Sequence, residues 1–554
     1  MDKAADIKTI NNIYQYWNVL YENQAIEKLD AFINEISSFP YPHTNNLDDW
    51  YKDAVVYSLY VDLFANNFNG LTEKLDYLQN LGVNCLWLLP VLQSPMRDAG
   101  FDISDFYKIR EALLGDDENS FDNFLQHAHA KGMRVLFDIA LNHTSDTHAW
   151  FVEAKKSKEN KYRDYYIWSD TKEKYSKARV IFKGIETCNW EKSGGQYYFH
   201  RFFNFQPDLN YKNPEVLVQM CKVLLYWQSK GVDGFRADAV PYLWKEEGTN
   251  CENLPKTHTI LKFMRAVLDY VKQGTLLLAE ACQPPKEVVK YLGNGDECHA
   301  AYHFPLMPNI YMAIAKHSAK PIVQILSPDK TPAIPEHTQW FTFLRCHDEL
   351  SLEKVYVTEQ ERAFIHDAYC HNLKWDFRQG EGISARLADL MQVDEKRILL
   401  AFSIMLTLPG TPIIYYGDEF AKFNDYAYYK KMVAQTGKDD TRFLVRGNID
   451  WKQLEIILQD RNHIGHNVFY KLRKMLQVRN NAKIFGRGSL HFVEHSDEWL
   501  VFKRIYKDDE WLIMHNLTSK VQDVDFRAEF PNAPTVLQPY GFAWIKRNED
   551  ERKI

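Results

Sequence analysis

Short apolar runs alternate with amphipathic helical patterns along most of this chain. The run at 55–64 is followed by a helical pattern at 71–82, a second run at 83–90, a second helical pattern at 121–132 and a third run at 133–141. Strand-length runs that alternate with helices in this way are typical of a parallel sheet with right-handed crossover connections. This alternation restricts the fold more than any other feature of the sequence.

The same pattern continues through the middle of the chain. Five more strand-like runs lie at 232–239, 275–281, 301–306, 340–349 and 410–419. Amphipathic helical patterns stand between several of them, as at 216–231 and 394–406. Eight parallel strands fit a closed barrel better than an open sheet, so we predict an α/β fold of the (β/α)8 TIM barrel type.

Three segments depart from the alternation. The stretch from about 145 to 208 is rich in Tyr, Trp, Lys and Gly, and we interpret it as a subdomain inserted after strand 3. Residues 1–48 have helical periodicity and end in a turn at FPYPHTNN, which predicts an N-terminal helical segment. Residues 481–554 have alternating, aromatic strand patterns, which predict a C-terminal antiparallel β domain. The predicted catalytic barrel is therefore 49–480.

Composition excludes several classes of partner. The 554 residues carry a net charge of -7 without a long run of one sign, so the chain offers no footprint for nucleic acid or for an anionic membrane. The eight cysteines are scattered and form no CxxC pair, which indicates neither a zinc site nor a disulfide framework. The N-terminus lacks the apolar stretch of a signal peptide. We expect a cytoplasmic protein that acts on a small neutral molecule.

Acidic residues follow several of the predicted strands. Asp238, Glu280 and Asp348 each lie at or just past such a run, and an earlier run ends near Asn142 and His143. In a parallel barrel the carboxyl ends of the strands are where active sites are built. A single acid there is more often a helix cap or a salt-bridge partner. Three acids in such runs, with His or Arg close by, favour a catalytic set.

The neighbours of two acids indicate their chemistry. Asp238 and Glu280 follow consecutive strands, which can bring their carboxyl groups to about 5 to 5.5 Å, the separation used by retaining glycosidases. Arg236 points to the same face as Asp238, and we expect this cation to lower the pKa of Asp238 and to keep it ionised. Glu280 lies between alanines after three leucines, and apolar surroundings raise the pKa of a carboxyl group.

Four segments resemble the signature segments of the α-amylase superfamily, in the same order: FDIALNH, GFRADA, LLAEA and RCHDE. QPDLN at 206–210 resembles an additional segment of α-glucosidase-like members. The resemblance covers roughly residues 50 to 480 and the C-terminal domain. It implies that Asp238 is the nucleophile, Glu280 the acid/base and Asp348 the stabiliser of the distorted sugar. It further implies that His143 and His347 hydrogen-bond the sugar, beside Arg236.

The segment SPMRDAGFD resembles the family's pair of an aspartate and an aromatic residue that stacks under the donor glucose. Asp98 and Phe101 occupy these positions. The family usually has Tyr where this chain has Phe101, and Phe keeps the stacking but lacks the hydroxyl. In exo-acting members this aspartate pairs with an arginine late in the barrel. Arg442 and Arg446 are both candidates for that role, and the sequence does not distinguish them.

Two subfamilies share features with this chain. The segments at 246–267, 277–314 and 343–353 resemble trehalose synthases, whereas the N-terminal helical segment and the segments at 417–429 and 439–451 resemble amylosucrases. Two departures from trehalose synthases stand out. Cys346 replaces the usual Asn before the His-Asp pair, and NNFNG at 66–70 is too short and too poor in carboxylates for a calcium loop. We expect no metal and no cofactor.

The resemblance therefore implies a retaining enzyme that transfers or hydrolyses an α-glucosyl unit of maltose, trehalose or sucrose. Trehalose synthase-like interconversion of maltose and trehalose is the leading interpretation. Amylosucrase-like transfer from sucrose and α-glucosidase activity are the alternatives. A catalytically inactive scaffold is a more distant one, because such relatives lose catalytic carboxylates and carry a membrane anchor, whereas this chain keeps all three acids. The sequence leaves the oligomeric state open.

Overall fold

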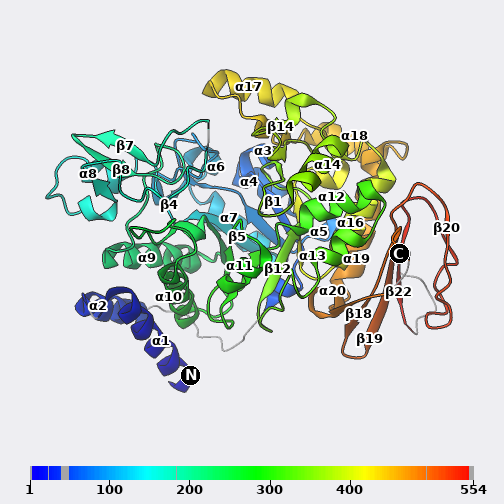
Figure 1. Cartoon of the computed structure of the whole chain (residues 1–554), viewed down its shortest axis with the longest axis horizontal. Coiled ribbons are helices and arrows are strands. Elements are labelled where there is room, and N and C mark those ends of the chain that lie inside the picture. The colour runs from blue at the N-terminus through cyan, green and yellow to red at the C-terminus, as the bar shows by residue number, and fades with distance from the viewer. Residues whose placement is uncertain (1–2, 23, 39–48, 183, 494–495, 548–553) are drawn as a thin grey trace.

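A computed structural model describes the whole chain except residues 1–2, 23, 39–48, 183, 494–495 and 548–553. Its centre is a closed barrel of eight parallel strands in the order β1, β2, β5, β9, β10, β11, β12 and β16 (Figure 1). Each barrel strand coincides with one of the eight predicted runs, although β11 and β12 begin one residue earlier than predicted, so the (β/α)8 prediction is confirmed. The strands are β1 (Val56–Leu59), β2 (Cys85–Leu88), β5 (Arg134–Ala140), β9 (Gly234–Asp238), β10 (Leu276–Ala279), β11 (Ala300–Tyr302), β12 (Gln339–Phe343) and β16 (Thr411–Tyr415).

Amphipathic helices cover the outside of the barrel. The larger ones are α5 (Leu75–Leu81), α7 (Ser120–Ala130), α9 (Pro214–Lys230), α10 (Pro255–Val271), α12 (Leu306–Lys316), α16 (Glu395–Thr407) and α19 (Ile464–Asn480). In α9, the Asn213 side chain caps the first turn, Pro214 follows it, and Gly231 ends the helix in the left-handed conformation. None of the helices in the described ranges is long and apolar enough to cross a membrane.

The segment between β5 and α9 folds into a small subdomain beside the barrel (Figure 1). It contains α8 (Ala149–Ala154) and a three-stranded sheet of β6 (Trp168–Ser169), β8 (Gln196–Phe199) and β7 (Trp190–Ser193). A β-bridge between His143 and Asp208 joins the start of this segment to its end. We call it the first insertion.

A second insertion, which the sequence did not indicate, lies between β12 and α16. It contains β13 (Leu350–Ser351), α14 (Glu359–Tyr369), β14 (Asp376–Phe377), β15 (Gly382–Ile383) and α15 (Leu387–Leu390). Its three strands have two residues each and pair in the order β13, β15 and β14. A two-residue strand is too short to show alternation, which is why the sequence pattern gave no sign of this sheet.

Two helices precede the barrel, as predicted for the N-terminal segment. They are α1 (Lys3–Tyr21) and α2 (Ile26–Ser37), and α1 packs along α10 (Figure 1). Trp17 is fully buried, with its ring 5.8 Å from that of Phe263, and the Tyr21 hydroxyl donates a 2.9 Å hydrogen bond to the Tyr211 carbonyl. The predicted turn at 39–46 lies outside the described residues.

The C-terminal β domain predicted from the sequence is present. Its main sheet is antiparallel, with the order β17 (Ser489–Phe492), β18 (Trp499–Tyr506), β19 (Asp509–Asn516) and β22 (Phe542–Lys546). The run at 521–526 contributes only β20 (Gln522–Asp523), which pairs with β21 (Val536–Leu537) in a separate ribbon. A fully buried arginine, Arg504, joins the main sheet to the barrel through hydrogen bonds to backbone carbonyls.

Candidate active site

A cavity of about 610 Å³ opens at the carboxyl ends of the barrel strands. All ten residues singled out in the sequence line it: Asp98, Phe101, His143, Arg236, Asp238, Glu280, His347, Asp348, Arg442 and Arg446. Loops of the barrel form the floor, and both insertions contribute to the walls. The fold thus brings together side chains that are up to 348 positions apart in the chain, from Asp98 to Arg446.

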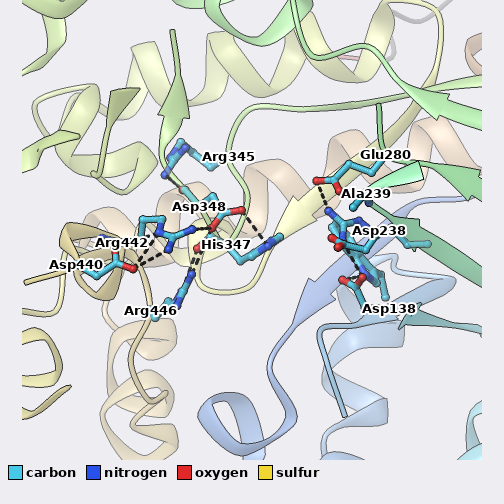
Figure 2. Close-up of polar contacts among 12 residues, drawn as sticks. Asp138, Asp238, Ala239, Glu280, Arg345, His347, Asp348, Asp440, Arg442 and Arg446 are labelled. Atoms are coloured by element: carbon cyan, nitrogen blue, oxygen red, sulfur yellow. Dashed lines mark hydrogen bonds and ion pairs between the residues drawn. The ribbon is translucent and has the colours of Figure 1, made fainter. Parts of the chain in front are cut away.

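Arg236 on β9 is the centre of the first polar cluster. Strand register places Asp138 of β5 beside Arg236, and it pairs Ala237 with Ala279 of β10, so that Asp238 and Glu280 follow side by side. The Arg236 guanidinium donates a 2.8 Å hydrogen bond to Asp138 and also pairs with Asp238 and Glu280. Figure 2 shows these three carboxyl groups gathered around one point. The single guanidinium of Arg236 therefore forms ion pairs with three acidic side chains.

The three acids of this cluster have raised pKa values. Burial raises the pKa of Asp138 to about 7, that of Asp238 to about 6 and that of Glu280 to about 7, although Arg236 opposes each shift. The expectation that Arg236 would hold the pKa of Asp238 low is wrong, because burial and the charge of Asp138 outweigh the cation. The expectation of a raised pKa for Glu280 is confirmed.

The backbone after β9 supports Glu280. Ala239 has a φ of 58°, in the left-handed region that non-glycine residues rarely adopt. This turn aims the Ala239 N–H at Glu280, whose Oε2 accepts a 3.1 Å hydrogen bond from it. Glu280 is thereby held by Arg236 through one oxygen and by a backbone N–H through the other. Its carboxyl group is fixed in position next to that of Asp238.

A second polar cluster surrounds Asp348 (Figure 2). One carboxyl oxygen contacts His347 Nε2 at 3.0 Å, and the other accepts hydrogen bonds from Arg442 at 3.1 Å and Arg446 at 3.3 Å. Burial alone would raise the pKa of Asp348, but His347 and the two arginines hold it well below its usual range. Asp440 pairs with Arg442 from the far side. The pKa of Asp348 is therefore shifted in the opposite direction to those of the acids around Arg236.

Asp98 lies at the edge of the second cluster without an ion pair to either arginine in the described part of the chain. Its Oδ2 accepts a 2.9 Å hydrogen bond from Gln206 Nε2. Burial raises the pKa of Asp98, and the charge of Arg442 opposes that shift. Arg442 is thus the arginine that acts electrostatically on Asp98, while both Arg442 and Arg446 direct their hydrogen bonds to Asp348.

Several buried polar atoms of the cavity have no partner. His143 Nε2 and His347 Nδ1 are both buried and make no hydrogen bond to the described part of the chain. Burial lowers the pKa of His143 and of His347, which favours neutral rings. The Phe101 ring stacks on that of His347 at 5.7 Å with an interplanar angle of 25°. An apolar ring beside unpaired ring nitrogens suits a sugar, which offers one hydrophobic face and a rim of hydroxyl groups.

The cavity also includes residues that sequence reasoning missed. From the two insertions come Arg179, Phe182, Glu353, Arg378, Gln379 and Glu381. Arg378, Gln379 and Gly380 have φ values of 48°, 56° and 89°, a left-handed turn that points into the site. No local sequence pattern predicts such a turn. The sequence did identify the QPDLN segment that contains Gln206. It did not predict the contact of Gln206 with Asp98.

The described residues contain no evident metal-binding site. No group of three or more His, Cys, Asp or Glu side chains there is arranged to hold an ion. The loop at 66–70, considered above for calcium, instead begins α4 (Phe68–Glu73), with the Asn67 side chain accepting a 2.9 Å hydrogen bond from Gly70 N–H.

Comparison with known proteins supplies three findings. A family model described as the α-amylase catalytic domain matches residues 46–488. A trehalose synthase/amylase of Mycolicibacterium smegmatis is 47% identical over 384 residues, covering 67% of this chain and 63% of that protein. A trehalose synthase of Thermus thermophilus is 41% identical over 524 residues, covering 87% of this chain and 52% of that protein. The chain therefore spans about half to three fifths of the length of these two relatives.

A solved structure shares the fold. The isomaltulose synthase of Klebsiella sp. LX3 superposes with a TM-score of 0.68 at 22% identity, covering 90% of this chain and 99% of the solved one. At that identity the likeness concerns the barrel architecture and not the substrate.

Proposed function

This chain belongs to the α-amylase family, and within it we propose that the protein is a retaining, trehalose synthase-like enzyme that interconverts maltose and trehalose. One observation carries the proposal. Asp238 and Glu280 share a single guanidinium, that of Arg236, at the bottom of a cavity that suits a sugar. The two carboxyl groups also interact directly through a side-chain hydrogen bond, which favours the close pair of retaining enzymes over the separation of about 6.5–9.5 Å that inversion requires. The geometry favours a double displacement.

In the first step Asp238 is the nucleophile. Its ionised carboxylate attacks the anomeric carbon while the protonated Glu280 gives its proton to the departing glycosidic oxygen. The bond from the anomeric carbon to that oxygen breaks, and a bond to Asp238 forms. The electrostatics support these roles, because the charge of an ionised Asp238 raises the pKa of Glu280 and so favours its protonated form.

In the second step a hydroxyl group of the freed sugar attacks the anomeric carbon. Glu280, now a carboxylate, takes the proton of that hydroxyl, and the bond to Asp238 breaks. When the sugar turns before it attacks, a different hydroxyl reacts and the disaccharide is isomerised. When water attacks instead, the result is hydrolysis. Two displacements at one carbon retain its α configuration.

The remaining residues hold the sugar. Asp348, anionic beside two arginines, accepts hydrogen bonds from hydroxyl groups of the donor ring as that ring distorts. His143, His347 and Phe101 line the same cavity, where the two imidazoles offer polar contacts and the Phe101 ring offers a surface for stacking. Asp98 lies where the cavity ends beyond the donor ring. The volume of about 610 Å³ falls within the range of about 300–1,000 Å³ usual for small-molecule sites.

The choice of maltose and trehalose rests on the two trehalose synthase relatives at 47% and 41% identity. The test is a product analysis after separate incubations with maltose, trehalose and sucrose. We expect trehalose from maltose and maltose from trehalose, with little glucose. Consumption of sucrose alone, with formation of a glucan, would identify an amylosucrase-like enzyme instead. Glucose as the sole product would identify an α-glucosidase.

The anomeric outcome is tested separately. Proton NMR during early turnover should detect the α-anomer of any free glucose first, because two inversions restore the starting configuration. A β-anomer as the first product would exclude Asp238 as a covalent nucleophile.

A further inference from the structure

Three phenylalanines of the first insertion form a continuous stack, which we call the aromatic column. Phe182 and Phe203 stack with ring centres 4.2 Å apart and an interplanar angle of 13°. Phe203 and Phe205 stack at 5.0 Å and 8°. Phe182 and Phe203 are 8% and 5% exposed. Three parallel rings in sequence make a stiff element, since each buries one or both faces on the next.

Cations from three other segments lie over this column. Arg378 of the second insertion lies 4.7 Å from the first ring, and Arg97, between β3 (Leu92–Gln93) and β4 (Asp105–Ile109), lies 4.3 Å from the last. Lys438, after α17 (Tyr426–Thr436), lies 4.7 Å and 4.8 Å from the second and third rings. Cations in this range attract the faces of aromatic rings. The column therefore joins four separate parts of the chain.

The column runs along the wall of the active site. Its first ring and Arg378 line the main cavity. Its second ring, Arg97 and Lys438 line an adjoining cavity of about 90 Å³. Asp98 and the two arginines Arg442 and Arg446 line both cavities and so form the partition between them. The column thus passes over the end of the main cavity at which Asp98 lies.

Hydrogen bonds tie the column to this partition. Gln206 is fully buried and donates to Asp98 Oδ2 at 2.9 Å, while its Oε1 accepts a 3.2 Å hydrogen bond from the Phe203 N–H. On the opposite side, Lys438 Nζ donates to the Arg97 carbonyl at 3.3 Å. A displacement of the column would therefore be transmitted to Asp98 through a single buried side chain.

We propose that the aromatic column and its three cations keep the two insertions and the segment after β16 closed over the cavity during the lifetime of the glucosyl-enzyme, and so set the partition between sugar and water as acceptor. This inference rests on the proposed function. Both outcomes break the same bond to Asp238 and pass the acceptor's proton to Glu280. They differ only in whether the oxygen comes from the retained sugar or from water. A closed wall retains the sugar and excludes water.

The experiment uses three substitutions that weaken the column and leave the catalytic acids in place: Phe182→Leu, Arg378→Met and Lys438→Met. The matched control is Trp168→Leu. Trp168 belongs to a similar stack in the same insertion, 5.8 Å from Phe151 at 6°, with the Arg163 guanidinium 3.4 Å from its ring. Trp168, Phe151 and Arg163 do not line the main cavity.

Two measurements report on closure. The first is the ratio of free glucose to transfer product from maltose, which should rise about two- to tenfold, the fold-change expected for the loss of one stacking or cation–π contact. The second is the incorporation of added ¹³C-glucose into the product, which should increase as the cavity opens. The control variant should keep both values of the unmodified protein.

If Phe182→Leu and Arg378→Met cleave the substrate normally and keep the glucose-to-transfer ratio of the unmodified protein, the inference is overturned. The proposed function would still stand. An equal change in Trp168→Leu would also overturn it, because the effect would then belong to the insertion as a whole. An unmodified protein that cleaves no α-glucoside would overturn the proposed function, and this inference with it.

Discussion

Asp138 and Arg236 lie opposite each other across the β5–β9 pair, joined by a 2.8 Å hydrogen bond from the guanidinium to Asp138 Oδ1. The other oxygen of Asp138 accepts a 3.2 Å hydrogen bond from the indole of Trp87. Asp138 is buried and does not line the cavity. It therefore acts on the reaction from outside the cavity, through its own charge and through the arginine that it shares with Asp238 and Glu280.

Replacing Asp138 by Asn should shift the acid limb of the activity profile to lower pH. The negative charge of Asp138 raises the pKa of Asp238, so removing that charge lowers the pKa and lets Asp238 ionise at lower pH. The measurement is kcat/KM for an α-glucoside between pH 4 and 9. An acid limb that stays in place would show that Asp138 has no electrostatic influence on Asp238.

The unmodified protein should show a bell-shaped dependence of kcat/KM on pH. Activity should rise as Asp238 loses its proton, through a pKa of about 6, and should fall as Glu280 loses its proton, through a pKa of about 7. Because the two groups interact, the limbs report on the pair rather than on either residue alone. An optimum well outside this interval would contradict the assigned protonation states.

Substitution of the two acids should have distinguishable effects. Asp238→Asn should lower turnover by several orders of magnitude on every substrate, because the nucleophile is lost. Glu280→Gln should slow cleavage of a disaccharide by roughly 10²- to 10⁴-fold but affect an activated aryl α-glucoside less, because that leaving group needs no proton. Circular dichroism would serve as the control for folding. Near-normal turnover in Asp238→Asn would remove this residue from the nucleophile role.

The end of the cavity near Asp98 should control substrate length. In Asp98→Ala the hydrogen bond from Gln206 is lost and a carboxyl group disappears from the partition. We expect the ratio of kcat/KM values for maltopentaose and maltose to increase several-fold. Val152→Ala, an exposed position in the first insertion away from the cavity, is the control. An unchanged ratio in Asp98→Ala would contradict a role for this residue in limiting substrate length.

Arg504 should be important for stability and not for chemistry. Its guanidinium donates to five backbone carbonyls, those of Thr407, Ile484, Phe485, Gly488 and Ser489. Arg504→Met leaves these carbonyls without that donor and should lower the free energy of unfolding by about 3 to 5 kcal/mol. Urea denaturation would measure the loss. The surface residue Arg527, which is exposed and pairs only with Asp525 in the described residues, is the matched control, and Arg527→Met should leave the unfolding midpoint nearly unchanged.

The barrel could be predicted from the sequence because each of its strands and helices is indicated by a local sequence pattern. Each barrel strand is a short apolar run, and the helices between them show their own period. The second insertion escaped prediction for the opposite reason. Its strands at Leu350–Ser351, Asp376–Phe377 and Gly382–Ile383 exist only through pairing with one another, and nothing in a two-residue run indicates its partner.

The residues of the site could be predicted from the sequence, but their pKa shifts and ion pairs could not. Asp238 and Arg236 stand two residues apart, so their contact follows from strand geometry. Burial, together with the charge of Asp138 from another strand, reverses the expected shift in the pKa of Asp238. Likewise, Arg442 and Arg446 were both found, but only three-dimensional structure reveals that both bind Asp348.

The single guanidinium between three acids has a practical consequence for anyone who assays this protein. Once these acids ionise, the cavity floor around Arg236 carries more negative than positive charge. A small ammonium compound that bears hydroxyl groups matches both that charge and the hydrogen-bonding pattern of a sugar. We therefore expect hydroxylated amine buffers to compete with substrate, which makes phosphate or carboxylate buffers the appropriate medium for measuring its rates.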